Sequence, residues 1–172
     1  DFVDFSEQSD ERIEAVIKTN VIAPMQLTKK VLAFMLEQQK GHIVNIGSTF
    51  GSIGFAWFSS YSSSKFALRG FSEALRRELA DTPVKVSYIA PRAVKTSLNS
   101  SAVYAMADAV KMNMDSPELV ARQIVNAIIK QRKDTFLGFP EKLFVRINAL
   151  LPRLVDYATR SQNQQAKKYL SS

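Results

Sequence analysis

The feature that most constrains this sequence is a regular alternation of helical and strand patterns. Stretches with apolar residues at helical spacing alternate with short apolar runs bounded by Gly or Pro. The expected helices cover residues 9–39, 61–80 and 117–130, and the expected strands cover residues 42–46, 84–90 and 135–139. Parallel strands need long crossover connections, usually helices, so this order is typical of a parallel sheet. The sequence therefore predicts an α/β fold, a three-layer doubly wound parallel sheet.

The pattern opens on a helix, with no strand before it. A dinucleotide-binding fold begins with a strand–turn–helix unit whose turn carries a glycine-rich phosphate loop, and no G-x-G-x-x-G run occurs in the 172 residues. We therefore expect an N-terminally truncated version of this fold, with a single domain over residues 1–172.

Two stretches interrupt the regular pattern. Pro24 lies inside the first helical stretch, where its missing N–H is expected to kink the helix. Residues 97–115 lack clear periodicity, and we expect an irregular or weakly helical mobile lobe there. Ser116 and Pro117 form a strong helix start signal, so the lobe should end at that point.

Composition excludes several classes of function. The chain has no cysteine, which rules out disulfides, zinc fingers and thiol nucleophiles. Its single histidine, His42, and the lack of a G-x-S-x-G elbow argue against a serine hydrolase, and no metal site is expected. The net charge of +7 comes from scattered basic residues, which indicates solvated faces and no nucleic-acid partner. No apolar run approaches the roughly 20 residues of a membrane span.

Tyr61 and Lys65 are the first candidates for chemistry. They are four residues apart at the start of an expected helix, so they share one helical face. A neighbouring cation lowers the pKa of a phenol from its ordinary value toward working pH, which makes it a usable acid or base. An ordinary helix start with a solvated lysine is the alternative. Ser48 favours the chemical interpretation, because it directly follows a strand at the edge where open α/β sheets bind ligands.

Asn20 is a polar residue on an otherwise apolar stripe, four residues before Pro24. A proline in a helix removes the donor for the carbonyl at i−4, so the carbonyl of Asn20 should be free. That carbonyl could hold the water of a proton relay. A core asparagine with satisfied hydrogen bonds and no relay is the alternative.

As an ordered set, these residues resemble the short-chain dehydrogenase/reductase family. The resemblance rests on Asn20, the run Gly41–Ser48, the run Tyr61–Leu68 and the segment Pro91–Thr96, and it extends over residues 1 to about 139. It implies a Rossmann-like fold, of which this chain would be the catalytic and substrate-binding portion. The family's glycine-rich loop and Asn-Asn-Ala-Gly segment have no counterpart in the sequence.

The resemblance also implies a role for each matching residue. Tyr61 would be the general acid/base, and Lys65 would tune it and hold the nicotinamide ribose. Ser48 would orient the substrate carbonyl, and Asn20 would anchor the water relay. Further cofactor contacts would come from the segment after the strand 84–90, at Pro91, Val94 and Thr96, with Arg92 where members usually have glycine.

The function implied is that of an NAD(P)-dependent oxidoreductase, which transfers a hydride between nicotinamide and an alcohol or carbonyl substrate. The residue that would choose NAD or NADP follows the second strand of such a fold, so both remain open. A non-catalytic binding or scaffold subunit of the same family is the alternative. A cytoplasmic location is expected. A homo-oligomer is also expected, because small residues form a stripe on the second helix at Ser63, Ala67, Gly70 and Ala74. Packing of this stripe on the protein's own core is the competing interpretation.

The end of the chain has its own pattern. Residues 140–158 form an amphipathic segment with Pro152 as an expected kink, and residues 161–172 form a polar tail. From residue 140 onward, six basic and two acidic side chains give a net charge of +4. A basic amphipathic helix is typical of an interfacial membrane anchor. The segment is therefore expected to lie on a membrane surface, to cover the access to a hydrophobic substrate, or simply to pack on the domain.

Overall fold

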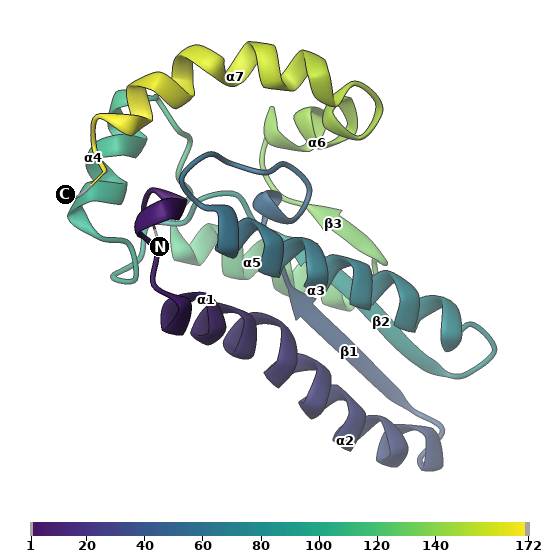
Figure 1. Cartoon of the computed structure of the whole chain (residues 1–172). Coiled ribbons are helices and arrows are strands. Elements are labelled where there is room, and N and C mark those ends of the chain that lie inside the picture. The colour runs from purple at the N-terminus through teal and green to yellow at the C-terminus, as the bar shows by residue number, and fades with distance from the viewer. Residues whose placement is uncertain (1, 171–172) are drawn as a thin grey trace.

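The computed structural model describes residues 2–170, and its centre is a parallel sheet with helices on both faces (Figure 1). In chain order the elements are the 3-10 helix η1 (Phe5–Glu7), α1 (Asp10–Ile17), the π-helix η2 (Lys18–Ile22), α2 (Ala23–Glu37), β1 (Gly41–Ile46), the 3-10 helix η3 (Thr49–Gly51), α3 (Ser59–Glu78), β2 (Val84–Ala90), α4 (Ser101–Ala109), α5 (Pro117–Ile129), β3 (Asp134–Phe136), α6 (Glu141–Leu150) and α7 (Pro152–Lys167).

The three strands follow the order β1-β2-β3, and both pairs are parallel. Gly41 pairs with Val84 at the start of the first ladder and Ile46 with Ile89 at its end. The carboxyl ends of all three strands therefore lie at one edge of the sheet. The predicted α/β class and parallel sheet are confirmed.

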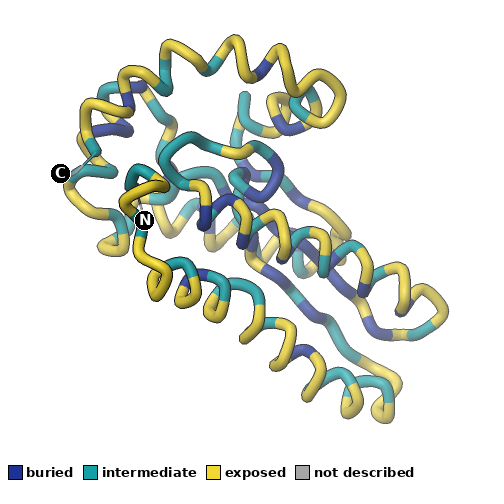
Figure 2. Tube along the Cα trace, viewed as in Figure 1, coloured by how far each residue is buried: buried dark blue, intermediate teal, exposed yellow. Residues whose placement is uncertain are grey.

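Alternate residues of each strand supply the two faces of the sheet. Ile43 packs with buried residues of α3, while its neighbour Val44 packs on the opposite side with residues of α5. The α2 helix covers the same face as α3, so the layers are helix, sheet and helix (Figure 1). Figure 2 shows the burial concentrated on the strands and on the inner side of α3.

The first helical stretch starts as predicted, and the helix is disturbed directly before Pro24, where it takes the form of a π-helix. Ser9 caps α1, because its hydroxyl accepts the N–H of Arg12 at 3.3 Å. The helix then continues as the π-helix η2. Here the N–H of Ala23 bonds to the carbonyl of Lys18, five residues back. One extra residue in the turn shifts the hydrogen-bond ladder directly before Pro24, which has no N–H to contribute.

Three other stretches can be compared with the expected elements. Residues 97–115 contain a regular helix, α4, capped by the hydroxyl of Ser100. The last strand stops at Phe136 rather than Phe139, two residues before Gly138, which has a φ of +90°. Residues 161–167 of the predicted polar tail are helical and continue α7, where Ala166 is buried, Trp57 donates to the carbonyl of Asn163 and Gln162 donates to that of Val110. Residues 171 and 172 lie outside the described part.

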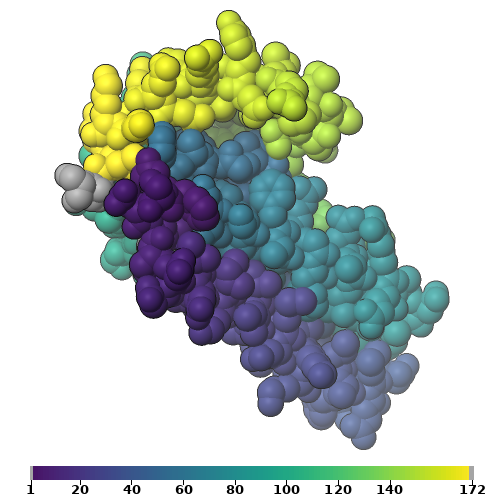
Figure 3. All heavy atoms as spheres, viewed as in Figure 1, coloured from purple at the N-terminus to yellow at the C-terminus, as the bar shows by residue number. Residues whose placement is uncertain are grey.

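The amphipathic segment forms two helices, with Pro152 in the first turn of α7. We call α4, α6 and α7 together the cap. The cap rests on the loop between β1 and α3, since Asn148 donates to the carbonyl of Ser52 at 2.9 Å and Trp57 donates to that of Asn163 at 3.2 Å. Figure 3 shows α7 lying across this end of the molecule. Among residues 2–170, no helix is both long and apolar enough to span a bilayer.

Candidate active site

The loop that carries Ser48 is tied to the end of the neighbouring strand. The N–H of Gly47 bonds to the carbonyl of Ile89 at 2.7 Å, and the N–H of Thr49 bonds to that of Pro91 at 2.9 Å. Ser48 therefore follows β1 at the carboxyl edge of the sheet, where the sequence placed it. Pro91 contributes through its backbone carbonyl, from a buried position.

Tyr88 is a residue of this site that sequence reasoning missed. It is fully buried on β2, and its hydroxyl donates to the carbonyl of Ser48 at 3.2 Å and accepts the N–H of Ser48 at 3.4 Å. A side chain at Gly47 would overlap the Tyr88 ring, and one at Gly51 would lie 2.5 Å from its hydroxyl. The available signal was a phenol in a strand that the sequence predicts to be buried, where its hydroxyl must find a hydrogen-bond partner.

Tyr61 lies in the first turn of α3, and its side chain hydrogen-bonds to that of Ser48. Burial raises the pKa of Tyr61, and the Ser48 bond offsets this only in part. The expected lowering of the Tyr61 pKa by Lys65 is therefore wrong for this structure. The Lys65 ammonium lies 5.6 Å from the centre of the Tyr61 ring and donates to the carbonyl of Ile46 at 3.4 Å, while burial lowers the pKa of Lys65 itself.

Asn20 is connected to α3 through the hydroxyl of Ser64. Its side-chain amide donates to Ser64 at 3.0 Å, and the Ser64 hydroxyl donates to the carbonyl of Tyr61 at 2.7 Å. Ser64 is fully buried and was missed by sequence reasoning, although it lies between Tyr61 and Lys65. The π-helix η2 thus supports the turn of α3 that carries Tyr61. The water expected on the Asn20 carbonyl stays a prediction.

A groove of about 660 Å³ runs along β1 between α2 and α3. Asn20 and Lys65 both line it, among mostly apolar residues such as Leu27 and Val31. An amide and an ammonium are hydrogen-bond donors that fit the hydroxyls of a ribose. The residues present therefore fit one end of a nicotinamide nucleotide.

Comparison with known proteins agrees with this geometry. The family model described as short chain dehydrogenase matches residues 1–107. The chain belongs to the short-chain dehydrogenase family. It is 33% identical to a dehydrogenase/reductase SDR family member 7B from Bos taurus over 97% of this chain and 53% of that protein. It thus spans about half the length of the relatives it matches.

Solved structures of this family share the fold. A short-chain dehydrogenase from Streptomyces avermitilis superposes with a TM-score of 0.71 and 27% identity over 92% of this chain and 65% of that one. The closed form of a serine dehydrogenase complexed with NADP+ gives a TM-score of 0.69 and 28% identity, and the match covers 79% of this chain and 59% of that one. The Rossmann fold predicted for the chain is thereby confirmed.

The last two predicted residues of this short-chain dehydrogenase lie between β2 and the cap. The carbonyl of Val94 accepts from the side chain of Asn99 at 2.8 Å, and the carbonyl of Thr96 accepts from the hydroxyl of Tyr104 at 3.0 Å. Val94 also pairs with Asp115 in a parallel bridge. Contact of Val94 and Thr96 with a carboxamide stays a prediction.

A cluster of phenylalanines from the loop reaches Tyr61 through Phe50, and sequence reasoning did not assign it to the site. The ring of Phe50 lies edge-on to Tyr61 at 6.2 Å and stacks on Phe55 at 4.9 Å. Phe58 completes the cluster, 5.5 Å from Phe50. One side of the Tyr61 ring is therefore aromatic.

Proposed function

We propose that this chain supplies the proton-transfer centre of an NAD(P)-dependent oxidoreductase that interconverts an alcohol and a carbonyl. The observation that carries the proposal is the convergence of Ser48, Tyr61 and Lys65 at the carboxyl edge of the sheet, with the half-buried Lys65 ammonium 5.6 Å from the Tyr61 ring and bonded to the carbonyl of Ile46. Membership in a family of oxidoreductases supports it. A bound nicotinamide would supply or accept the hydride.

The residues of the chain divide the remaining work. Tyr61 gives a proton to the carbonyl oxygen during reduction, or removes one from the alcohol during oxidation. The hydroxyl of Ser48 orients that oxygen and stabilises its developing charge. Because the pKa of Tyr61 is raised, the phenol is protonated at neutral pH and ready to act as the acid in reduction.

The cofactor would enter the groove along β1, where Lys65 is available to the ribose and Asn20, bonded to Ser64, would anchor the water relay. Val94 and Thr96 would contact the carboxamide from the other strand end. Other contacts, including those to the pyrophosphate, would come from residues beyond this chain, since the sequence has no glycine-rich phosphate loop. Nothing in the groove selects NAD over NADP.

The substrate is proposed to be hydrophobic. The rings of Phe50, Phe55 and Phe58 form one cluster that reaches Tyr61. An apolar wall beside the reacting oxygen favours a substrate whose carbon chain can be buried. The alternative of a non-catalytic subunit gains no support from the site, because every polar group of the proposed chemistry is present.

Replacement of Tyr61 by phenylalanine in the complete protein tests the proposal. The ring keeps its packing and only the transferable proton is lost, so turnover of aldehydes and ketones with NADH or NADPH should fall by about 10²–10⁴-fold. Cofactor affinity and the melting temperature should change little. Tyr157→Phe, at an exposed position on α7, is the matched control. A Tyr61→Phe variant that kept more than half of the wild-type rate would overturn the proposal.

A further inference from the structure

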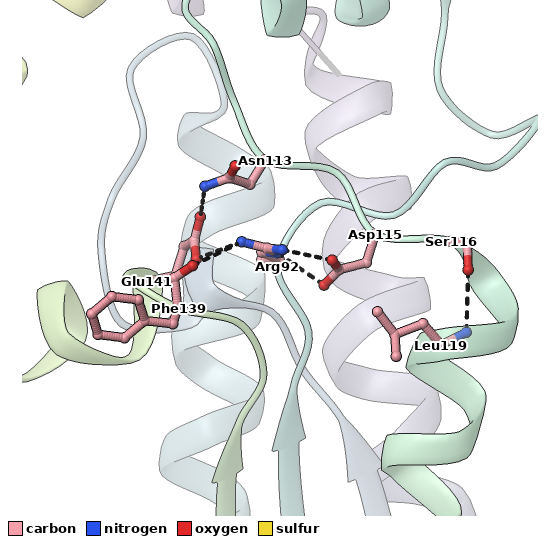
Figure 4. A network of polar contacts seen from close by, with 7 residues as sticks. All are labelled: Arg92, Asn113, Asp115, Ser116, Leu119, Phe139 and Glu141. Carbon is pink, nitrogen blue, oxygen red and sulfur yellow. Dashed lines mark hydrogen bonds and ion pairs between the residues drawn. The ribbon is translucent and has the colours of Figure 1, made fainter.

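Arg92, which takes the place of the family's usual glycine, is held by two carboxylates (Figure 4). Its Nε and Nη2 donate to the two oxygens of Asp115 at 2.9 and 2.6 Å. Its Nη1 donates to Glu141 at 2.9 Å and to the carbonyl of Phe139 at 3.2 Å. The side chain of Arg92 is only 17% exposed, and that of Asp115 only 7%. Charge-assisted bonds of this bidentate kind are both strong and directional.

The Asp115 side of this network reaches the predicted cofactor segment. The N–H of Asp115 bonds to the carbonyl of Ala93, and the carbonyl of Asp115 accepts the N–H of Lys95, both at 2.9 Å. The backbone of Asp115 thus holds the residues on both sides of Val94. Fixing the Asp115 carboxylate therefore fixes Val94 against the end of β2.

The Glu141 side reaches the cap. Glu141 is the first residue of α6, and its second oxygen accepts from the side chain of Asn113 at 3.0 Å. Farther along α6, Asn148 donates to Ser52 in the loop that follows Ser48. One helix therefore connects the Arg92 network to the substrate side of the site.

The backbone around Arg92 leaves room for this side chain. A side chain at Gly138 would lie 2.6 Å from Cδ of Arg92, and the φ of +90° at Gly138 is a conformation that favours glycine. The β3–α6 connection is thus shaped around the guanidinium. A glycine at position 92 would leave Asp115 and Glu141 without their shared partner.

We propose that Arg92 is a positioning residue that couples the two halves of the site. Through Asp115 it sets the segment around Val94, and through Glu141 it sets α6 and the cap over the substrate loop. The planar guanidinium bonds both carboxylates in fixed directions, so displacement of one half disturbs the other. The kinetic side of this proposal rests on the proposed function, whereas its structural side does not.

The first test needs no turnover. Hydrogen–deuterium exchange of the complete protein should become faster in Arg92→Met within residues 93–96, 113–116 and 139–146. Arg76→Met is the matched control, because Arg76 forms a similar two-pronged ion pair with Asp134 and is 19% exposed, at the opposite end of β3. It should leave those three segments unchanged. Unaltered exchange in Arg92→Met, or equal acceleration in Arg76→Met, would overturn the coupling.

The second test uses steady-state kinetics to distinguish the Asp115 side of the site from the Glu141 side. KM is measured for NADH or NADPH and for the best substrate of an aldehyde and ketone series. Glu141→Gln should raise KM for the carbonyl about ten- to a hundredfold, the size expected for one lost charge-assisted bond, with little change in KM for the cofactor. Asp115→Asn should raise KM for the cofactor with little change in KM for the carbonyl. Arg92→Met should raise both KM values.

Arg92→Lys is the conservative variant. Its ammonium can bond one carboxylate well, but it lacks the planar guanidinium that bonds both at once. We therefore expect Arg92→Lys to restore one of the two KM values to that of the wild type and to leave the other raised. If Arg92→Met lowered kcat and left both KM values within twofold, Arg92 would not position the two halves. If the wild-type protein had no activity on any carbonyl or alcohol, the proposed function would fail while the exchange result still decided the coupling.

Discussion

The hydroxyl of Tyr88 lies between the two backbone groups of Ser48, donating to its carbonyl at 3.2 Å and accepting its N–H at 3.4 Å. The two residues are 40 positions apart and belong to neighbouring strand ends. Because the ring also fills the space beside Gly47 and Gly51, the loop can follow only a path that glycines allow. The position of the proposed substrate-orienting serine is thus set by a side chain of the adjacent strand.

Tyr88→Phe keeps the ring and removes this hydroxyl. We expect kcat to fall about ten- to a hundredfold, because a catalytic group misplaced by a fraction of an ångström loses its alignment with the substrate. Stability should fall by about 1–3 kcal/mol, the cost of leaving buried backbone groups without a partner. Steady-state kinetics and chemical unfolding measure the two effects. Thr82→Val, which also loses one bond to a backbone carbonyl but lies before β2 at the opposite edge of the sheet, is the control and should keep kcat. A Tyr88→Phe variant with normal kcat would show that Ser48 holds its place unaided.

The raised pKa of Tyr61 predicts a direction for the pH dependence. A phenol with a pKa above its ordinary value of 10.0 stays protonated through the neutral range. Carbonyl reduction should therefore be nearly constant between pH 6 and 9 and decline only at higher pH, while alcohol oxidation, which needs the phenolate, should rise across the same range. Profiles of kcat/KM in both directions check this. A reduction rate that falls with an apparent pKa near 7 would contradict the expected direction.

The small-residue stripe on α3 points to solvent rather than to the protein's own core. Ser63, Ala67, Gly70 and Ala74 are all exposed, and a side chain at Gly70 would meet no atom within 4 Å. The competing interpretation, packing on the core, is thus wrong for the described part of the chain. We predict that Gly70→Trp lowers the oligomeric mass of the complete protein in light scattering. Ala121→Trp, on exposed α5, should leave it unchanged. An unaltered mass for Gly70→Trp would remove α3 from the interface.

The junction of α6 and α7 exposes apolar and basic side chains together. Leu150 and Tyr157 are 81% and 78% exposed, and Leu151 and Leu154 are also more than half exposed. The basic neighbours are Lys142, Arg146, Arg153 and Arg160. We predict that the complete protein sediments with anionic vesicles at low salt, and that Leu150→Ser combined with Leu154→Ser weakens this more than an exposed pair on α5, Val125→Ser with Ile129→Ser. Equal loss in both double variants, or a protein that stays in the supernatant, would argue against a membrane surface here.

The spacing of residues along the sequence was sufficient to predict each feature that depends only on neighbours along the chain. The i, i+4 relation of Tyr61 and Lys65 follows from helix geometry, and Ser48 follows from its position directly after a strand. The alternation of periodicities likewise predicted the parallel sheet, since a crossover helix must connect parallel strands. The proline at position 24 revealed a disturbed helix, although not that the disturbance takes the form of a π turn.

Only the tertiary structure decided the features that depend on residues far apart in the sequence. The roles of Tyr88 and Ser64 arise where separate elements meet at one strand end, and the carboxylates that hold Arg92 come from the segment before α5 and from the first residue of α6. The direction of the Tyr61 pKa was misjudged for the same reason. A nearby lysine can be read from spacing, but desolvation is the sum of everything packed around the phenol, and distant segments supply that packing only after the chain has folded.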